Sequence, residues 1–190
     1  MVVTIRITRL ALLVALLYLS LMLMVPAVTI GVFAQNSAEH TAKSATTFKE
    51  MASLVGEWEA VQDGVPVKET YTLTANGSAL MAQTQAGNDP AMITMFTVDG
   101  DHLVATHYCI AGNQPQMITG IPDGLQRGVM FSLARVTGMK TPDDWHNTGL
   151  TIKLDDQNHM TQRWTYLYQG KTGTTVFHYT RKGNSARTLH

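Results

Sequence analysis

The chain has little cysteine and no excess of charge of either sign. Its 190 residues include a single cysteine, Cys109, so an intrachain disulfide is excluded and stability must come from the core. The simplest interpretation of Cys109 is that it packs in the core as a small apolar residue. Lysine plus arginine number 14, as do aspartate plus glutamate, and this balance argues against nucleic acid as a partner.

Motifs of common catalytic sites are also missing from the sequence. It contains no nucleophile elbow, no glycine-rich phosphate loop and no metalloprotease motif. Two acidic pairs, Asp143-Asp144 and Asp155-Asp156, fall in expected turns, where solvated carboxylates are common. The sequence therefore favours a protein that is not an enzyme, and it assigns no catalytic residue.

The long apolar run of the chain is confined to its start. Arg6 and Arg9 precede apolar residues that extend to Val32-Phe33-Ala34. This pattern predicts a secretory signal over residues 1–34, cleaved after Ala34. Because about 20 apolar residues can span a bilayer, an uncleaved membrane anchor is the alternative, and it would be the only contact with a membrane. Either way we expect a secreted or periplasmic domain.

The remainder divides into a lead-in, one domain and a tail. Residues 35–42 are small and polar, which predicts a flexible lead-in, and residues 184–190 form a polar tail. The domain is expected over residues 43–183. It begins with Phe48, Met51 and Leu54 at helical spacing, which predict a short helix over 44–54 that would plug one end of the fold.

Regular turn signals predict an all-β domain. Asp63-Gly64, Asn76-Gly77 and Asp99-Gly100 are strong hairpin signals, because type I′ turns need positive φ at both central residues. Ten strand-like runs of about 8–12 residues lie between such signals. They are expected near 55–62, 65–74, 78–85, 91–98, 102–110, 114–120, 126–136, 145–154, 159–168 and 172–182. These runs predict an up-and-down antiparallel barrel of about ten strands, because closure removes exposed edges.

Alternation of apolar and polar residues predicts the inward faces. The inward residues expected from strands two, eight, nine and ten are Val67, Glu69, Tyr71, Leu73, His146, Leu150, Ile152, Leu154, Met160, Trp164, Tyr166, Tyr168, Phe177, Tyr179 and Arg181. In the fifth strand the pattern permits either Leu103, Ala105 and His107 or the alternate set with Tyr108 to face inward.

The first and last strands carry the signature of barrel closure. Gly56 and Trp58 open the first strand, and Arg181 lies near the end of the last. Because terminal strands must meet in a closed barrel, we expect the Arg181 guanidinium to stack on the Trp58 indole. Arg181 should also donate hydrogen bonds to carbonyls near the plug helix.

Four segments carry a resemblance to a known family: Leu54–Trp58, Thr106–Cys109, Gly112–Met117 and Phe177–Lys182. Over roughly residues 48–182 the chain resembles uncharacterised bacterial secreted proteins that are similar to lipocalin-like (calycin-type) barrels of unknown function. It departs from the family pattern at Gln116, where arginine is usual, and at Pro90-Ala91-Met92, where a His-Glu pair commonly precedes the methionine. The resemblance implies the fold and no activity.

A barrel of this size can hold one small ligand, so a binding module for a small hydrophobic molecule is the favoured function. The candidate ligand-binding residues are Glu69, Tyr71, His107, Asn113, Gln114, His146 and Trp164. No cofactor is expected. The alternatives are haem or a transition metal at an inward histidine, drawn from His107, His146 and His159, and a structural domain with a filled interior.

Overall fold

The computed structural model describes residues 36–183, so the predicted signal segment 1–34 and the tail 184–190 lie outside the described residues. Of the described residues, 36–39 and 40–183 belong to two separate units, and every described strand lies in the second. Within the described range, no helix is long and apolar enough to cross a membrane.

One helix covers residues 36–51 and continues into the short 3₁₀ turn η1 (Ala52–Leu54). It is longer than the helix predicted over 44–54, and it includes every described residue of the segment expected to be flexible. The reason is that residues 36–43 are largely exposed and carry no apolar stripe. Periodicity detects only a helix that buries one face.

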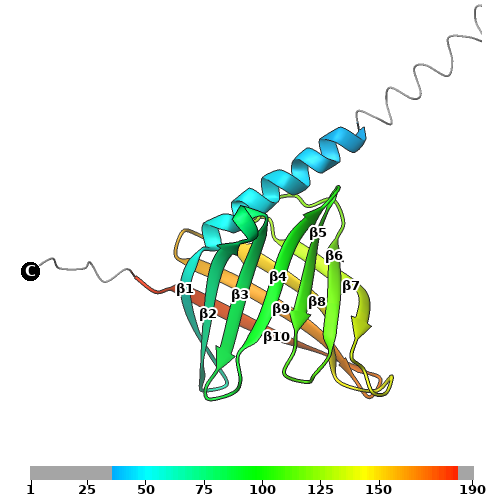
Figure 1. Ribbon diagram of the computed structural model, residues 1–190. Helices are drawn as coiled ribbons and strands as arrows, with labels where there is room; N and C mark the ends of the chain where they lie inside the picture. The colour runs from blue at the N-terminus through cyan, green and yellow to red at the C-terminus, as the bar shows by residue number, and fades with distance from the viewer. Residues whose placement is uncertain (1–35, 184–190) are drawn as a thin grey trace, which may run out of the picture. The chain divides into compact units, whose positions relative to one another are not determined.

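Ten strands come after the helix. Their bounds are β1 Gly56–Gln62, β2 Val65–Thr74, β3 Ala79–Ala86, β4 Met92–Asp99, β5 His102–Tyr108, β6 Gln114–Thr119, β7 Val129–Thr137, β8 His146–Leu154, β9 His159–Tyr168 and β10 Lys171–Arg181. A second 3₁₀ turn, η2 (Ala75–Gly77), joins β2 to β3. Each strand pairs antiparallel with its sequence neighbours, and β1 pairs with β10 (Figure 1). The predicted ten-stranded antiparallel barrel is therefore confirmed.

The turns have the backbone geometry that their residues favour. Asp63 and Gly64 have φ values of 51° and 81°, and Gln169 and Gly170 have 49° and 71°. Positive φ at both central residues is the type I′ arrangement, which matches the right-handed twist of the paired strands. These turns set the register of the β1–β2 and β9–β10 hairpins.

The helix closes one end of the barrel. Met51 and Leu54 are fully buried in the same apolar cluster as Trp58 and Phe96. Ser44 Oγ donates a hydrogen bond of 2.7 Å to the carbonyl of Gly100, in the β4–β5 turn. Further along, the Leu125 amide, in the β6–β7 loop, donates a bond of 2.8 Å to the Glu50 carboxylate. The plug is thus held by apolar packing and by two loops of that end.

The β1–β10 seam is short and is fastened by Arg181. Only two residue pairs join these strands, Trp58 with Arg181 and Glu59 with Thr180. The Arg181 guanidinium lies 4.1 Å from the centre of the Trp58 ring. It donates hydrogen bonds of 3.0, 2.9 and 2.8 Å to the carbonyls of Gln157, Val55 and Ser53, respectively.

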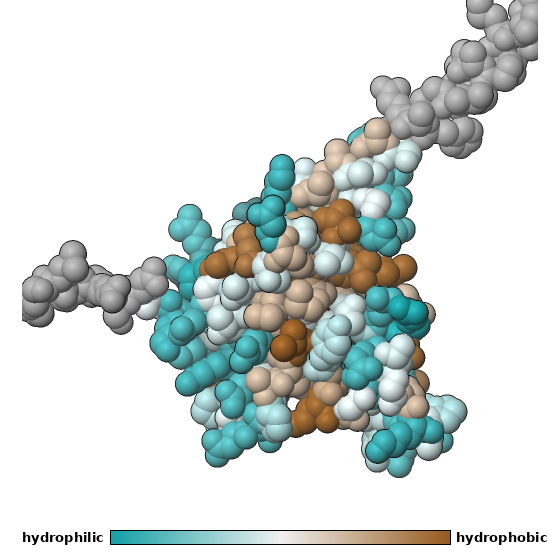
Figure 2. Space-filling model, in the orientation of Figure 1, coloured by the Kyte–Doolittle hydropathy of each residue, from teal (hydrophilic) through white to brown (hydrophobic). Residues whose placement is uncertain are grey.

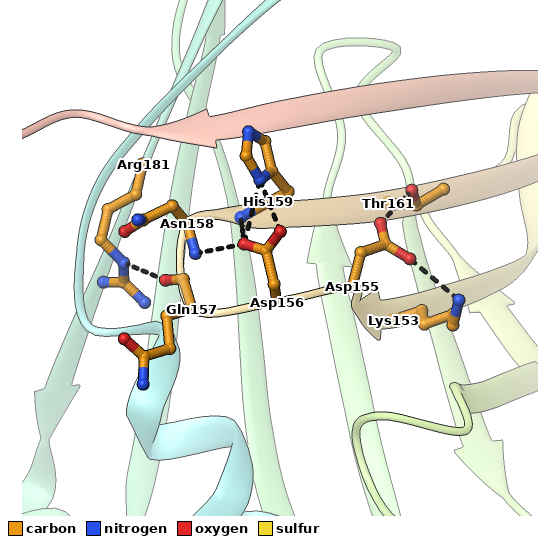
Figure 3. A network of polar contacts seen from close by, with 8 residues as sticks. All are labelled: Lys153, Asp155, Asp156, Gln157, Asn158, His159, Thr161 and Arg181. Carbon is orange, nitrogen blue, oxygen red and sulfur yellow. Dashed lines mark hydrogen bonds and ion pairs between the residues drawn. The ribbon is translucent and has the colours of Figure 1, made fainter.

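The β8–β9 loop that receives Arg181 is itself well ordered by polar contacts (Figure 3). Asp156 accepts hydrogen bonds from the Asn158 and His159 amides and contacts the His159 ring. Asp155 bonds Lys153 and Thr161 at 2.9 and 2.6 Å. Arg181 therefore docks onto a preorganised loop.

Most of the predicted faces are observed. In β5 the structure selects Leu103, Ala105 and His107 as the inner set and leaves Tyr108 half exposed. Leu73 and Tyr168 have the predicted inward parity, since Leu73 pairs with the buried Leu80 and Tyr168 follows the cavity residue Tyr166 by two positions. They are nevertheless 41% and 47% exposed, because both lie near strand ends, beyond the enclosed interior. On the face shown in Figure 2, apolar residues occur in small groups among polar ones.

Candidate functional site

A cavity of about 120 Å³ lies inside the barrel and is partly open to solvent. Its lining residues are Thr84, Met92, His107, Asn147, Trp164, Tyr166, Thr175, Phe177 and Tyr179. They come from β3, β4, β5, β8, β9 and β10. Thr84 and Met92 flank the β3–β4 loop, and His107 stands near the β5–β6 turn, so the cavity faces the loops opposite the helical plug.

A buried polar cluster lies beside this cavity. Gln162 is its centre: Nε2 donates hydrogen bonds of 2.8 Å to Glu69 Oε2 and 2.8 Å to the Tyr71 hydroxyl. On the other side, Trp164 Nε1 donates a bond of 2.9 Å to Gln162 Oε1. Glu69, Tyr71 and Gln162 are each at most 2% exposed. The cluster therefore fixes the Trp164 ring on the cavity wall.

Burial dominates the ionisation of this cluster. It raises the pKa of Glu69 above its ordinary value, and hydrogen bonds from Gln162 and neighbouring hydroxyls oppose this only in part. Burial also raises the pKa of Tyr71 and Tyr179, and the nearby charge of Glu69 adds to both shifts. The cluster therefore favours its uncharged state.

His107 is the inward histidine of the cavity. Its Nδ1 lies 2.9 Å from Thr94 Oγ1, and its ring packs against Trp164 with centroids 4.9 Å apart. Burial lowers the pKa of His107 to about 4, so the ring is neutral at pH 7. Within residues 36–183, Nε2 of this ring has no hydrogen-bond partner.

The expected inward position of His146 was wrong. The β8–β9 register shifts between Asn147 and Gly149, which is a β-bulge. Asn147 pairs with the cavity residue Tyr166, whereas His146 pairs with Leu167 on the opposite face. His146 is buried, but its Nδ1 bonds the Asp144 carbonyl at 2.8 Å and it does not line the cavity. Alternation counted from Leu150 fails because the bulge inserts one extra residue.

Asn113 and Gln114 also lie away from the cavity lining. Asn113 Nδ2 donates a bond of 2.7 Å to the Trp145 carbonyl. Gln114 bonds the Gly112 carbonyl and accepts a bond from Thr137. Both side chains therefore hold the β5–β6 turn to its neighbours instead of facing a ligand.

The three candidate histidines are not brought together. His107 is inside, His146 lies on the other face of β8, and His159 is exposed and contacts Asp156 at 2.8 Å. Among residues 36–183, no group of three or more His, Cys, Asp or Glu side chains is arranged to hold a metal ion. Cys109 is buried, and burial raises the pKa of its thiol.

A larger hollow, of about 420 Å³, lies along the β1–β10 seam. Most of its lining is exposed, including Glu59, Lys68 and His178. It is a solvated groove in which a small molecule would keep most of its contact with water. The inner cavity is the better candidate site because none of its lining residues is exposed and several of them are aromatic.

Residue-by-residue reading of the sequence missed Gln162, Asn147 and Thr94. Gln162 shares the alternation of Met160 and Trp164, so its inward position could have been inferred from parity. Thr94 lies opposite His107 in the β4–β5 register. Asn147 had no comparable signal, because a single sequence does not show where a bulge will fall.

Comparisons with known proteins identify no family for the chain. No protein-family model and no curated protein matches it. Among solved structures it is similar to a protein of unknown function from the DUF3598 family of Nostoc punctiforme, at 12% identity and a TM-score of 0.38. The match covers 69% of this chain and 48% of the other, so the chain spans about half the length of that protein.

Proposed function

We propose that this barrel is a binding module for a small, mostly apolar molecule held in the inner cavity. The observation that supports this most directly is the composition of the walls. Trp164, Tyr166, Phe177 and Met92 supply the apolar surface, and a few polar groups stand among them. Ligand sites typically have this composition, with polar groups that fix orientation.

The volume of the cavity sets the size of the ligand. A cavity of roughly 150 Å³ holds benzene, whereas sites for drug-sized molecules occupy about 300–1,000 Å³. At about 120 Å³, the cavity fits a single small ring or a short chain of a few carbons. A larger molecule would have to leave part of itself outside, toward the loops.

Ligand-observed NMR with toluene tests this proposal. Thr175 lines the cavity, whereas the adjacent Thr174 is exposed on the opposite face of β10. Thr175→Phe should fill the space and abolish the saturation-transfer signal of toluene. Thr174→Phe is the matched control and should leave the signal intact. If toluene fails to bind the unmodified protein, or if both variants behave alike, the interior is structural.

A transition metal at an inward histidine is the second candidate, because a haem is much larger than the space of about 120 Å³. One observation favours it: His107 stands on the cavity wall with Nε2 free of a hydrogen-bond partner among residues 36–183. Neutral imidazole is a common metal ligand. Metal analysis of protein purified without chelator tests it, since a stoichiometric metal that His107→Ala removes would establish this function.

We also propose that the chain is exported and lipocalin-like, with residues 1–34 acting as the export signal. The support is Arg6 and Arg9 ahead of an apolar run that ends at Ala34. N-terminal sequencing of protein from the native host should find a start near Gln35. An intact Met1 in a membrane fraction would favour the anchor.

A further inference from the structure

The inner cavity contains a buried polar side chain without a partner. Asn147 is 5% exposed and lines the cavity, and its Oδ1 is buried without a hydrogen-bond partner in the described part of the chain. The Nδ2 group of the same side chain makes no hydrogen bond to residues 36–183 either. A buried acceptor left unpaired destabilises the fold, so such groups are rare in native proteins and call for an explanation.

The backbone is built to aim Asn147 inward. The bulge between Asn147 and Gly149 places it opposite Tyr166, on the cavity side. Gly149 permits this bulge, because a Cβ there would come within 2.8 Å of Thr165 Oγ1 and 3.2 Å of the Phe131 carbonyl. Bulges commonly re-aim a side chain beside a functional site. An apolar residue at 147 would avoid the unpaired amide, so the asparagine is better explained by a ligand than by packing.

The surroundings of Asn147 define the charge of that ligand. The cavity lining holds no aspartate, glutamate, lysine or arginine among the described residues, and His107 is neutral at pH 7. Glu69 lies in the adjacent cluster, and its carboxyl is already bonded by Gln162. Moving a charged molecule from water into this space would be strongly unfavourable without an opposite charge on the wall. The cavity therefore suits a neutral molecule.

We propose that Asn147 is the residue that orients the ligand, and that the ligand is a neutral, ring-sized molecule with a hydroxyl group that donates a hydrogen bond to Asn147 Oδ1. This inference rests on the proposed binding function and specifies its ligand class. The aromatic wall of Trp164, Tyr166 and Phe177 would contact the ring, while the amide selects the hydroxyl.

The test compares phenol, toluene and benzylammonium as probes of similar size. By ligand-observed NMR titration, the unmodified protein should bind phenol about three- to tenfold more tightly than toluene, which is the range expected for one hydrogen bond. Asn147→Leu should remove this preference while retaining toluene binding. Thr174→Leu, on the exposed opposite face of β10, is the control and should keep the preference.

A second measurement does not depend on any variant. The side-chain amide signals of Asn147 in a ¹⁵N-correlated spectrum should shift on addition of phenol far more than on addition of toluene. Equal affinity for phenol and toluene would overturn the role of Asn147 and leave the binding function standing. Tightest binding of benzylammonium would overturn the neutral ligand class. Failure of all three probes would refute the binding function itself.

Discussion

Replacement of Arg181 by lysine tests the physical account of how the barrel closes. The substitution keeps the positive charge and removes the planar guanidinium. That group bonds three carbonyls, from Ser53, Val55 and Gln157, while it stacks on Trp58. A lysine ammonium is a compact point charge that cannot reach three such acceptors and stack at once.

The expected loss can be worked from these contacts. Hydrogen bonds to charged groups contribute about 1.5–3 kcal/mol when well buried. Arg181 is only partly buried, so water replaces part of each lost bond, and we take roughly 0.5–1 kcal/mol for each of two lost bonds. Stacking at an exposed site adds about 0.5–1 kcal/mol. Arg181→Lys should therefore lower the free energy of unfolding by about 1.5–3 kcal/mol, out of a typical 5–15 kcal/mol.

Urea denaturation followed by circular dichroism measures this loss. The neighbouring Lys182 provides the control, because its side chain is exposed and makes only surface ion pairs with Glu57 and Glu59. Lys182→Gln should have a much smaller effect, since such pairs contribute little. A double-mutant cycle with Trp58→Ala should show coupling of about 0.5–1 kcal/mol to Arg181. If Arg181→Lys is no more harmful than Lys182→Gln, the seam is held by its strands alone and our account is wrong.

Three further predictions concern the cavity and its polar cluster. Burial raises the pKa of Glu69 above its ordinary 4.5, so the folded state binds the carboxyl proton more tightly than the unfolded state does. The free energy of unfolding should therefore fall as pH rises from about 4.5 through the folded pKa. Urea denaturation at each pH measures this fall, and Glu69→Gln should remove it. Burial lowers the pKa of His107 to about 4 from its ordinary 6.5. The stability contributed by the neutral buried ring should therefore be lost as pH falls from about 6.5 through 4. The imidazole NMR signals should titrate near pH 4, and a midpoint above 6 would contradict the burial. A Cβ at Gly173 would overlap the Tyr166 ring, so Gly173→Ala should displace that ring and weaken toluene binding, whereas Gly183→Ala, where a Cβ meets nothing, should not.

The local pattern of the sequence was enough to predict the strands and the closure of the barrel. Asp63-Gly64 and similar pairs mark turns through their own backbone preferences, and alternation places Trp58, Glu69 and Tyr179 inside. The meeting of Trp58 with Arg181 follows once the first and last strands are paired. Each of these inferences needs only neighbouring residues and the rule that sheet edges must be covered.

The cavity, in contrast, was decided by contacts between distant strands. Because of the bulge in β8, Asn147 and not His146 lies on the inner face. Gln162 is the centre of the polar cluster because Glu69 and Tyr71, from β2, reach it through the barrel interior. Alternation gives the direction of a side chain but neither its depth nor its partner. Those depend on how ten strands pack together, and that packing also leaves the space of about 120 Å³ in which a ligand could bind.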